Sequence, residues 1–121
     1  MKICITSTGN DMDSPVDPRF GRAAHLLLVD TEKRDVRALA GATGAAHGAG
    51  IQAARAVVES GVTVLVTGQI GPNAYDVLDA AGISVYLTPA GTVAGAIQDL
   101  DAGRLEKISA PSSRPHSGMR R

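Results

Sequence analysis

The first half of the chain alternates short apolar runs with polar segments. Residues 2–7, 25–30 and 36–39 are rich in β-branched side chains or leucine, a composition that predicts three strands. The polar turn at 31–35 joins the last two strands as an antiparallel hairpin. Residues 8–22 form a long loop with two prolines and two glycines. Loops of this length without regular structure are uncommon and are often functional.

The second half alternates strand-like runs with helical spacing. Apolar runs at 62–67 and 83–87 predict two strands, and apolar positions three or four residues apart predict helices over 51–60, 74–81 and 93–102. A glycine follows each helix or its last turn, where such residues commonly end a helix. Strand–helix–strand units require parallel strands with right-handed crossovers. We therefore expect an α/β domain with a mixed five-stranded sheet.

Charge and composition divide the chain into a domain over residues 1–103 and a tail over residues 104–121. The tail carries five basic residues against Glu106 alone, and its Ser, Pro and Gly content predicts a flexible segment. The whole chain has a net charge of zero, so the domain itself is mildly acidic. Only 2% of the residues are aromatic, which indicates an aliphatic core without stacking platforms for nucleic acid. We expect no nucleic-acid partner.

Cys4 is the only cysteine, which excludes an intrachain disulfide. It lies within the first predicted strand, where a free cysteine is usually a small core hydrophobe, although it is also a possible metal ligand. No signal peptide precedes it, and no apolar run approaches the roughly 18–20 residues that a membrane span needs. These features predict a cytoplasmic protein without a membrane partner.

The glycine-rich segment 41–50 precedes the first predicted helix. Backbone N–H groups at a helix N-terminus can hold an anion, so one hypothesis is an anionic ligand at this segment. The alternative is that the glycines only permit a tight turn. His47 lies in this segment, where small neighbours leave its imidazole accessible. Neither the Walker A nor the dinucleotide-binding glycine pattern is present, and zinc-type Cys-x-x-Cys spacing is also absent.

The long loop contains Arg19 and Arg22 on either side of Phe20 and Gly21. Its prolines restrict the loop, so the two guanidinium groups offer positioned donors for an anion. The alternative is that Phe20 covers the strand ends while the arginines pair with nearby aspartates.

Four aspartates allow a different hypothesis, a metal-dependent hydrolase that uses Mg²⁺: Asp11, Asp13, Asp17 and Asp30. No carboxylate lies inside the first predicted strand, where a ribonuclease-H-type nuclease places a metal ligand. Aspartates in such loops commonly bond their own backbone and form turns.

Three segments carry recognisable motifs. They are Asn-Asp-Met-Asp-Ser-Pro-Val with Pro-Arg-Phe-Gly-Arg-Ala over residues 10–23, Gly-Ala-Gly-Ile-Gln-Ala-Ala over 48–54, and Thr-Gly-Gln-Ile-Gly-Pro-Asn-Ala over 67–74. With these three motifs in this order, the chain resembles the dinitrogenase iron–molybdenum cofactor biosynthesis family. Its members include NifX-type carriers and the C-terminal domain of NifB-type proteins. The resemblance covers about residues 1–105.

The resemblance implies a ribonuclease-H-like three-layer α/β/α sandwich with strand order 3-2-1-4-5. It also implies non-enzymatic binding or carriage of an iron–sulfur or iron–molybdenum cluster or its precursor, with cluster biosynthesis proteins as partners. Such clusters are anionic, and the motifs contribute the expected contacts: Arg19, Phe20, Gly21, Arg22, His47, Gly48, Gly50 and Gly68.

The first motif departs from the family at one position. Members thought to ligate the cofactor often carry His-Phe-Gly, whereas this chain has Arg19-Phe20-Gly21. Any metal bond is therefore expected from Cys4 or His47. A small-anion sensor or interaction module on the same fold is the alternative hypothesis.

Overall fold

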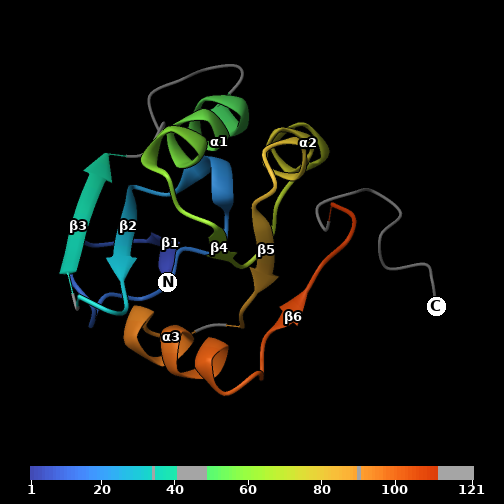
Figure 1. Cartoon of the computed structure of the whole chain (residues 1–121). Coiled ribbons are helices and arrows are strands. Elements are labelled where there is room, and N and C mark those ends of the chain that lie inside the picture. Colours follow the sequence, from blue (N-terminus) through green and yellow to red (C-terminus); the bar gives the residue numbers. More distant parts are fainter. Residues whose placement is uncertain (34, 41–48, 90, 112–121) are drawn as a thin grey trace.

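The computed structural model describes residues 1–33, 35–40, 49–89 and 91–111. The elements follow one another as β1 (Lys2–Ser7), a 3₁₀ turn η1 (Phe20–Arg22), β2 (His25–Asp30), β3 (Asp35–Ala40), α1 (Ala49–Ser60), β4 (Val64–Thr67), α2 (Pro72–Ala80), β5 (Ser84–Leu87), α3 (Val93–Asp101) and β6 (Glu106–Lys107). Figure 1 shows this arrangement. No helix in the described ranges is both long and apolar enough to cross a membrane.

The strands form one mixed sheet in the order β3-β2-β1-β4-β5-β6. β1, β4 and β5 are parallel, whereas β2, β3 and β6 run antiparallel to their neighbours. The predicted α/β class and the order 3-2-1-4-5 are confirmed. The sixth strand is an addition, and it lies inside the segment that we assigned to a tail. It was missed because β6 is two exposed charged residues long, without an apolar run of its own.

The sheet separates two apolar clusters, and the alternation of side chains along each strand decides which cluster a residue joins. Cys4 and Leu65 face the layer of α1 and α2, and these two helices pack against each other. Ile3 and Val66 face the opposite layer, where α3 covers the sheet. Figure 1 shows α1 and α2 on one side and α3 on the other, the α/β/α layering expected from the resemblance.

The long loop between β1 and β2 packs against the start of α3. The Val16 N–H donates to the Gly91 carbonyl (2.8 Å), and the Ala94 N–H donates to the Met12 carbonyl (2.9 Å). The loop therefore satisfies first-turn N–H groups of α3 that would otherwise lack partners. The hydroxyl of Thr92 caps the same helix by accepting the Gly95 N–H at 3.1 Å.

Candidate functional site

An open cavity of about 370 Å³ lies where three separate segments meet. Its walls come from η1 with the preceding Arg19, from Gly50 and Ile51 at the start of α1, and from residues 69–74 between β4 and α2. β4 ends at Thr67, so the cavity lies beyond the carboxyl ends of the parallel strands, where open α/β sheets bind ligands. The three motifs of the sequence thus converge on one site, which we call the rim cavity.

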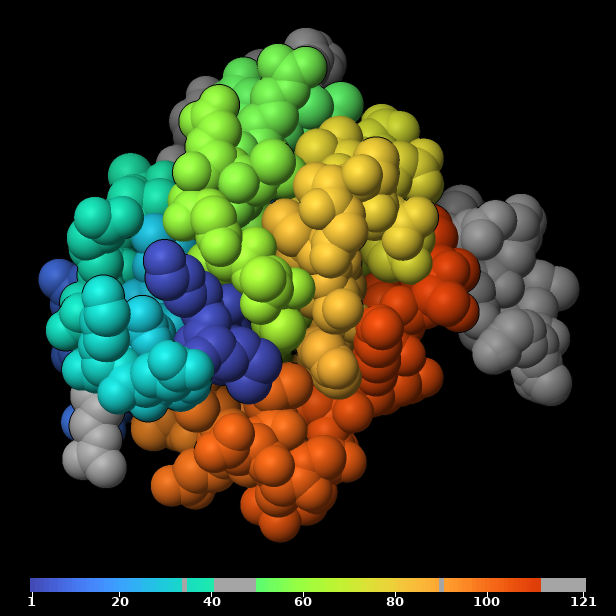
Figure 2. All heavy atoms as spheres, viewed as in Figure 1, coloured from blue at the N-terminus to red at the C-terminus, as the bar shows by residue number. Residues whose placement is uncertain are grey.

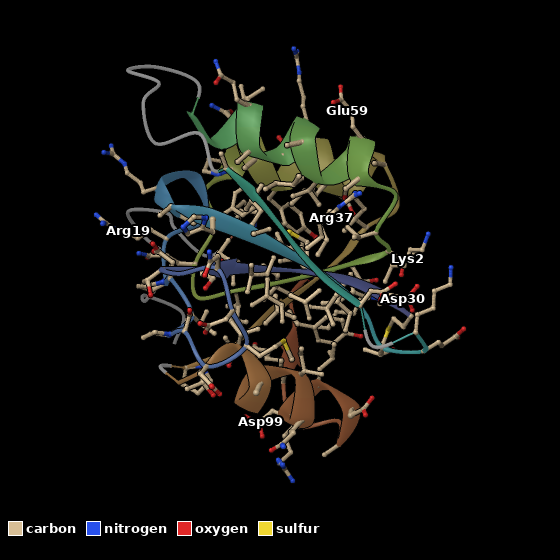
Figure 3. The ribbon with its side chains drawn as sticks, turned by 90° about the vertical axis from the view of Figure 1, so that its left-hand side faces the viewer. Lys2, Arg19, Asp30, Arg37, Glu59 and Asp99 are labelled. Carbon is tan, nitrogen blue, oxygen red and sulfur yellow. The ribbon has the colours of Figure 1, made fainter. Side chains whose placement is uncertain are left out.

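Arg19 and Arg22 supply the positive charge of the rim cavity. Both side chains are exposed, and in the part of the chain that the structure describes neither forms an ion pair with a carboxylate. In Figure 3, Arg19 lies at the left-hand end of the molecule, far from Lys2 and Asp30 at the other end. The alternative that the two arginines neutralise neighbouring aspartates is therefore not what the structure shows, and both guanidinium groups remain available to an anion.

Phe20 has a different role from its arginine neighbours. Its side chain is only 3% exposed and belongs to the apolar cluster beneath α1 and α2. Its backbone N–H donates to the Gln69 carbonyl at 3.2 Å. Phe20 thus anchors η1 to the core and fixes the backbone positions from which Arg19 and Arg22 extend at the rim.

A close backbone contact fixes the loop to the turn after β4. A Cβ atom at Gly68 would lie 2.6 Å from Cα and 2.7 Å from the carbonyl oxygen of Pro18. Only glycine therefore allows this close approach. The next residues along both segments, Arg19 and Gln69, form a parallel β-bridge. The structure gives Gly68 a positioning role rather than an exposed contact surface.

Asp17 connects the same loop to the strand ends and is itself buried. Its carbonyl accepts the Thr6 hydroxyl (2.7 Å), its N–H donates to the Thr6 carbonyl (2.9 Å), and its Oδ1 accepts the Arg19 N–H (3.0 Å). Thr6 and Thr67, at the ends of β1 and β4, share a hydroxyl–hydroxyl hydrogen bond of 2.9 Å. Sequence reasoning missed these threonines. The only available signal was a polar residue at the carboxyl end of each apolar run.

The first turn of α2 opens onto the rim cavity. Gly71 is the N-cap and provides no side-chain acceptor, and Pro72 occupies the first turn, where its fixed φ suits a helix start. The N–H groups of a first turn lack acceptors within their own helix, and Asn73 and Ala74 of this turn both line the cavity. Gly50 lies against this turn, since a Cβ there would be 3.5 Å from that of Ala74. The helix dipole and these donors add to the attraction of the cavity for an anion.

Of the two metal ligands expected from sequence, the structure describes only Cys4. Cys4 is fully buried in the core, and burial raises the pKa of its thiol from 9.0 to about 12, so the thiol is protonated at neutral pH. A protonated, enclosed thiol is a poor metal ligand. His47 and Gly48 lie outside the described residues. Among the described residues, no group of three His, Cys, Asp or Glu side chains could hold a metal ion.

The acidic residues of the hydrolase hypothesis serve local structure. Asp11 Oδ1 accepts the Asp13 N–H and the Ser14 hydroxyl, each at 3.0 Å. Asp30 accepts the Glu32 N–H at 3.0 Å at the end of β2 away from the rim. These are the turn-forming roles of the alternative interpretation.

The fold and the rim cavity define a small α/β domain in which residues of three motif segments line one basic opening. The particular family follows from comparison with known proteins. Residues 1–103 match the family model described as dinitrogenase iron-molybdenum cofactor, and the chain belongs to this family. This confirms the resemblance found in the sequence and associates the chain with iron–molybdenum cofactor biosynthesis or binding.

Two solved structures and one sequence relative are also similar to this chain. The apo form of the orange protein from Desulfovibrio gigas is 38% identical, with a TM-score of 0.87 over 91% of this chain and 94% of that one. A Thermotoga protein described provisionally as a NifB protein is 36% identical, with a TM-score of 0.83 over 94% and 97%. An uncharacterized protein of Methanocaldococcus jannaschii is 29% identical over 112 residues, covering 89% of this chain and 92% of its own.

Proposed function

We propose that this chain binds and carries an anionic metal–sulfur cluster, or its precursor, in the rim cavity and catalyses no reaction on it. The observation that carries the proposal is the pair of exposed arginines on the wall of a cavity of about 370 Å³, neither of which forms an ion pair with any residue that the structure describes. Membership in a cofactor family supplies the class of cargo. Cluster biosynthesis proteins are the partners that this role requires.

The chemistry of the cavity favours a cluster held by charge and hydrogen bonds. Its described lining contains no cysteine, histidine or carboxylate, and its N–H donors include Arg19, Arg22, the first-turn amides of α2 and the side-chain amides of Gln69 and Asn73. These groups are donors, and they match the sulfide and oxide surface of a cluster rather than its metal ions. Binding without metal–protein bonds also suits a carrier, because release then breaks no covalent ligand bond.

Anaerobic reconstitution tests the proposal. The protein is incubated with ferrous iron and sulfide, with and without molybdate, and desalted, and bound metal is read from absorbance and elemental analysis. We expect uptake by the wild type. We expect roughly 10–100-fold weaker retention in Arg19→Gln and in Arg22→Gln, because a hydrogen bond to a charged group contributes about 1.5–3 kcal/mol.

Arg55→Gln is the matched control, since Arg55 is exposed on α1 but lines a different hollow. Equal loss in the control, or full retention in both rim variants, contradicts the proposed site. A small-anion sensor on the same rim is the second candidate, because the cavity's donors need no metal. Stabilisation by phosphate alone, without metal uptake, would favour that candidate.

A further inference from the structure

Among the residues that the structure describes, β3 is an edge strand of the sheet, with β2 on one side and no strand on the other. It pairs with β2 over its whole length without a bulge, and all six of its residues are exposed or half-buried. Figure 2 shows the β2–β3 hairpin at the left-hand margin of the molecule. Such an edge presents a row of unpaired N–H and C=O groups, which can pair with a strand of another chain.

The two faces of β3 differ in chemistry. Arg37 lies opposite Leu28, so Asp35 and Arg37 are on the α1 face. Val36 and Ala38 lie on the α3 face, yet α3 leaves both exposed, and Val36 is 41% exposed. The edge therefore combines an apolar row on one face with two opposite charges, two residues apart, on the other.

β3 carries two charged residues, Asp35 and Arg37. Asp35 lies directly opposite Asp30, and like charges in that position destabilise a strand pair. Among the described residues, neither Asp35 nor Arg37 forms an ion pair. Both side chains line a second hollow of about 330 Å³, together with Lys2 and Ser60, at the end of the sheet away from the rim cavity. In Figure 3, Arg37 lies below α1.

We propose that two copies of this chain associate by antiparallel pairing of β3 with β3, about a two-fold axis at Val36. Residues that face each other across an antiparallel pair have their side chains on the same face of the sheet. A residue of β3 can therefore face its own copy, or a residue an even number of positions away, but not its sequence neighbour. The two-fold axis must then lie midway between the two copies of one residue. An axis at Val36 places Asp35 of each copy opposite Arg37 of the other, and Val36 opposite Val36. The partner's guanidinium then offsets the repulsion between Asp30 and Asp35.

Other registers lack this complementarity. An axis at Arg37 places the two arginines against each other, and an axis at Ala38 places Arg37 against Leu39. The proposed axis lies near the start of β3, whereas Ala40 at its end pairs with His25 just after η1. Association therefore leaves the rim cavity open, and the dimer does not depend on the proposed cargo.

Sedimentation equilibrium of the purified chain between about 10 μM and 1 mM tests the proposal. The paired segment is short, and small interfaces are typically weak, so we expect a dimer that dissociates within this range. In the dimer, each of the single variants Asp35→Arg and Arg37→Asp replaces an opposite-charge pair across the axis by a like-charge pair. The two-fold symmetry makes this happen at two places. Each should weaken association about tenfold, an effect of roughly 1.4 kcal/mol.

The combined variant Asp35→Arg/Arg37→Asp distinguishes this register from any other. It restores opposite charges across the axis, so the dimer should return to within about threefold of the wild type. Asp101→Arg, the same charge change on exposed α3, should leave association unchanged, and thermal melts verify folding of every variant. A wild type that stays monomeric at 1 mM overturns the proposal, and so does a dimer that the combined variant fails to restore.

Discussion

Phe20, the single phenylalanine of the chain, lies between two exposed arginines and is itself buried. Its ring joins the core under α1 and α2, while Arg19 and Arg22 remain in solvent on either side. A buried aromatic ring between two cations is a simple means of fixing charged side chains at the edge of a sheet. The rim cavity therefore depends on the core for its geometry.

Phe20→Ala should destabilise the fold by about 3–5 kcal/mol, because it removes a nearly fully buried ring and leaves a cavity. Urea unfolding followed by circular dichroism measures this change in the free energy of unfolding. A loss below about 1 kcal/mol would mean that the ring does not anchor η1.

Gly68 and Gly50 both belong to motifs, but the structure predicts opposite outcomes for them. Gly68→Ala forces a Cβ against the Pro18 backbone and should lower the free energy of unfolding by about 1–3 kcal/mol. It should also weaken the binding of anions in the rim cavity. Gly50→Ala makes only an ordinary contact at 3.5 Å with Ala74 and should be tolerated. Thermal melts of the two variants compare them directly, and equal melting temperatures would contradict the close contact.

Cys4 makes stability depend on pH in the alkaline range. Burial raises the pKa of its thiol from 9.0 to about 12, so the folded chain keeps a proton that the unfolded chain loses between these values. The stabilising contribution is complete below pH 9 and falls by roughly 1 kcal/mol per pH unit as pH rises toward 12. Unfolding of wild type and Cys4→Ala across pH 8–11 should show a steeper decline for the wild type. Parallel declines would exclude this cause.

At the scale of elements, the strands and helices were predictable because each carries its own apolar period. The run at 62–67 and the helix after Pro72 needed no tertiary information. β6 did not carry such a signal, since Glu106 and Lys107 become a strand only by pairing with Leu87 and Tyr86. The sequence therefore placed a tail boundary at 103, before a strand that the neighbouring edge of the sheet creates.

β6 makes that boundary testable. The Ile108 N–H donates to the Val85 carbonyl at 3.0 Å, and the Ile108 side chain packs against the core. A chain ending at residue 103 should therefore lose about 1–2 kcal/mol relative to a chain ending at residue 111, mainly through lost apolar burial. Chemical denaturation of the two truncations measures the difference. Equal stability would support a domain that ends at 103.

For the candidate site, the sequence predicted which residues take part, whereas the structure was needed to show what most of them do. Arg19, Phe20 and Gly68 were identifiable from motifs, but their separate roles as charge, anchor and close contact required coordinates. The links from Thr6 and Asp17 could not be predicted, because they join residues that are distant in sequence through backbone groups. Cys4 was named as a ligand from its residue type alone, and its burial in the core argues against that role.

For the whole molecule, the central claim is that the basic rim at the carboxyl ends of the parallel strands holds an anionic metal–sulfur cluster. One end of the sheet gathers the three motifs around the rim cavity, while the opposite end carries the charges of the proposed dimer contact. The two functions are thus spatially separate and can be tested independently.

Metal and sulfide analysis of the protein purified without oxygen tests the central claim most directly. The wild type should retain iron or molybdenum together with sulfide, and the Arg19→Gln/Arg22→Gln variant, equally folded by its melting curve, should retain neither above background. A wild type without bound metal, or a double variant that retains as much as the wild type, would contradict the account.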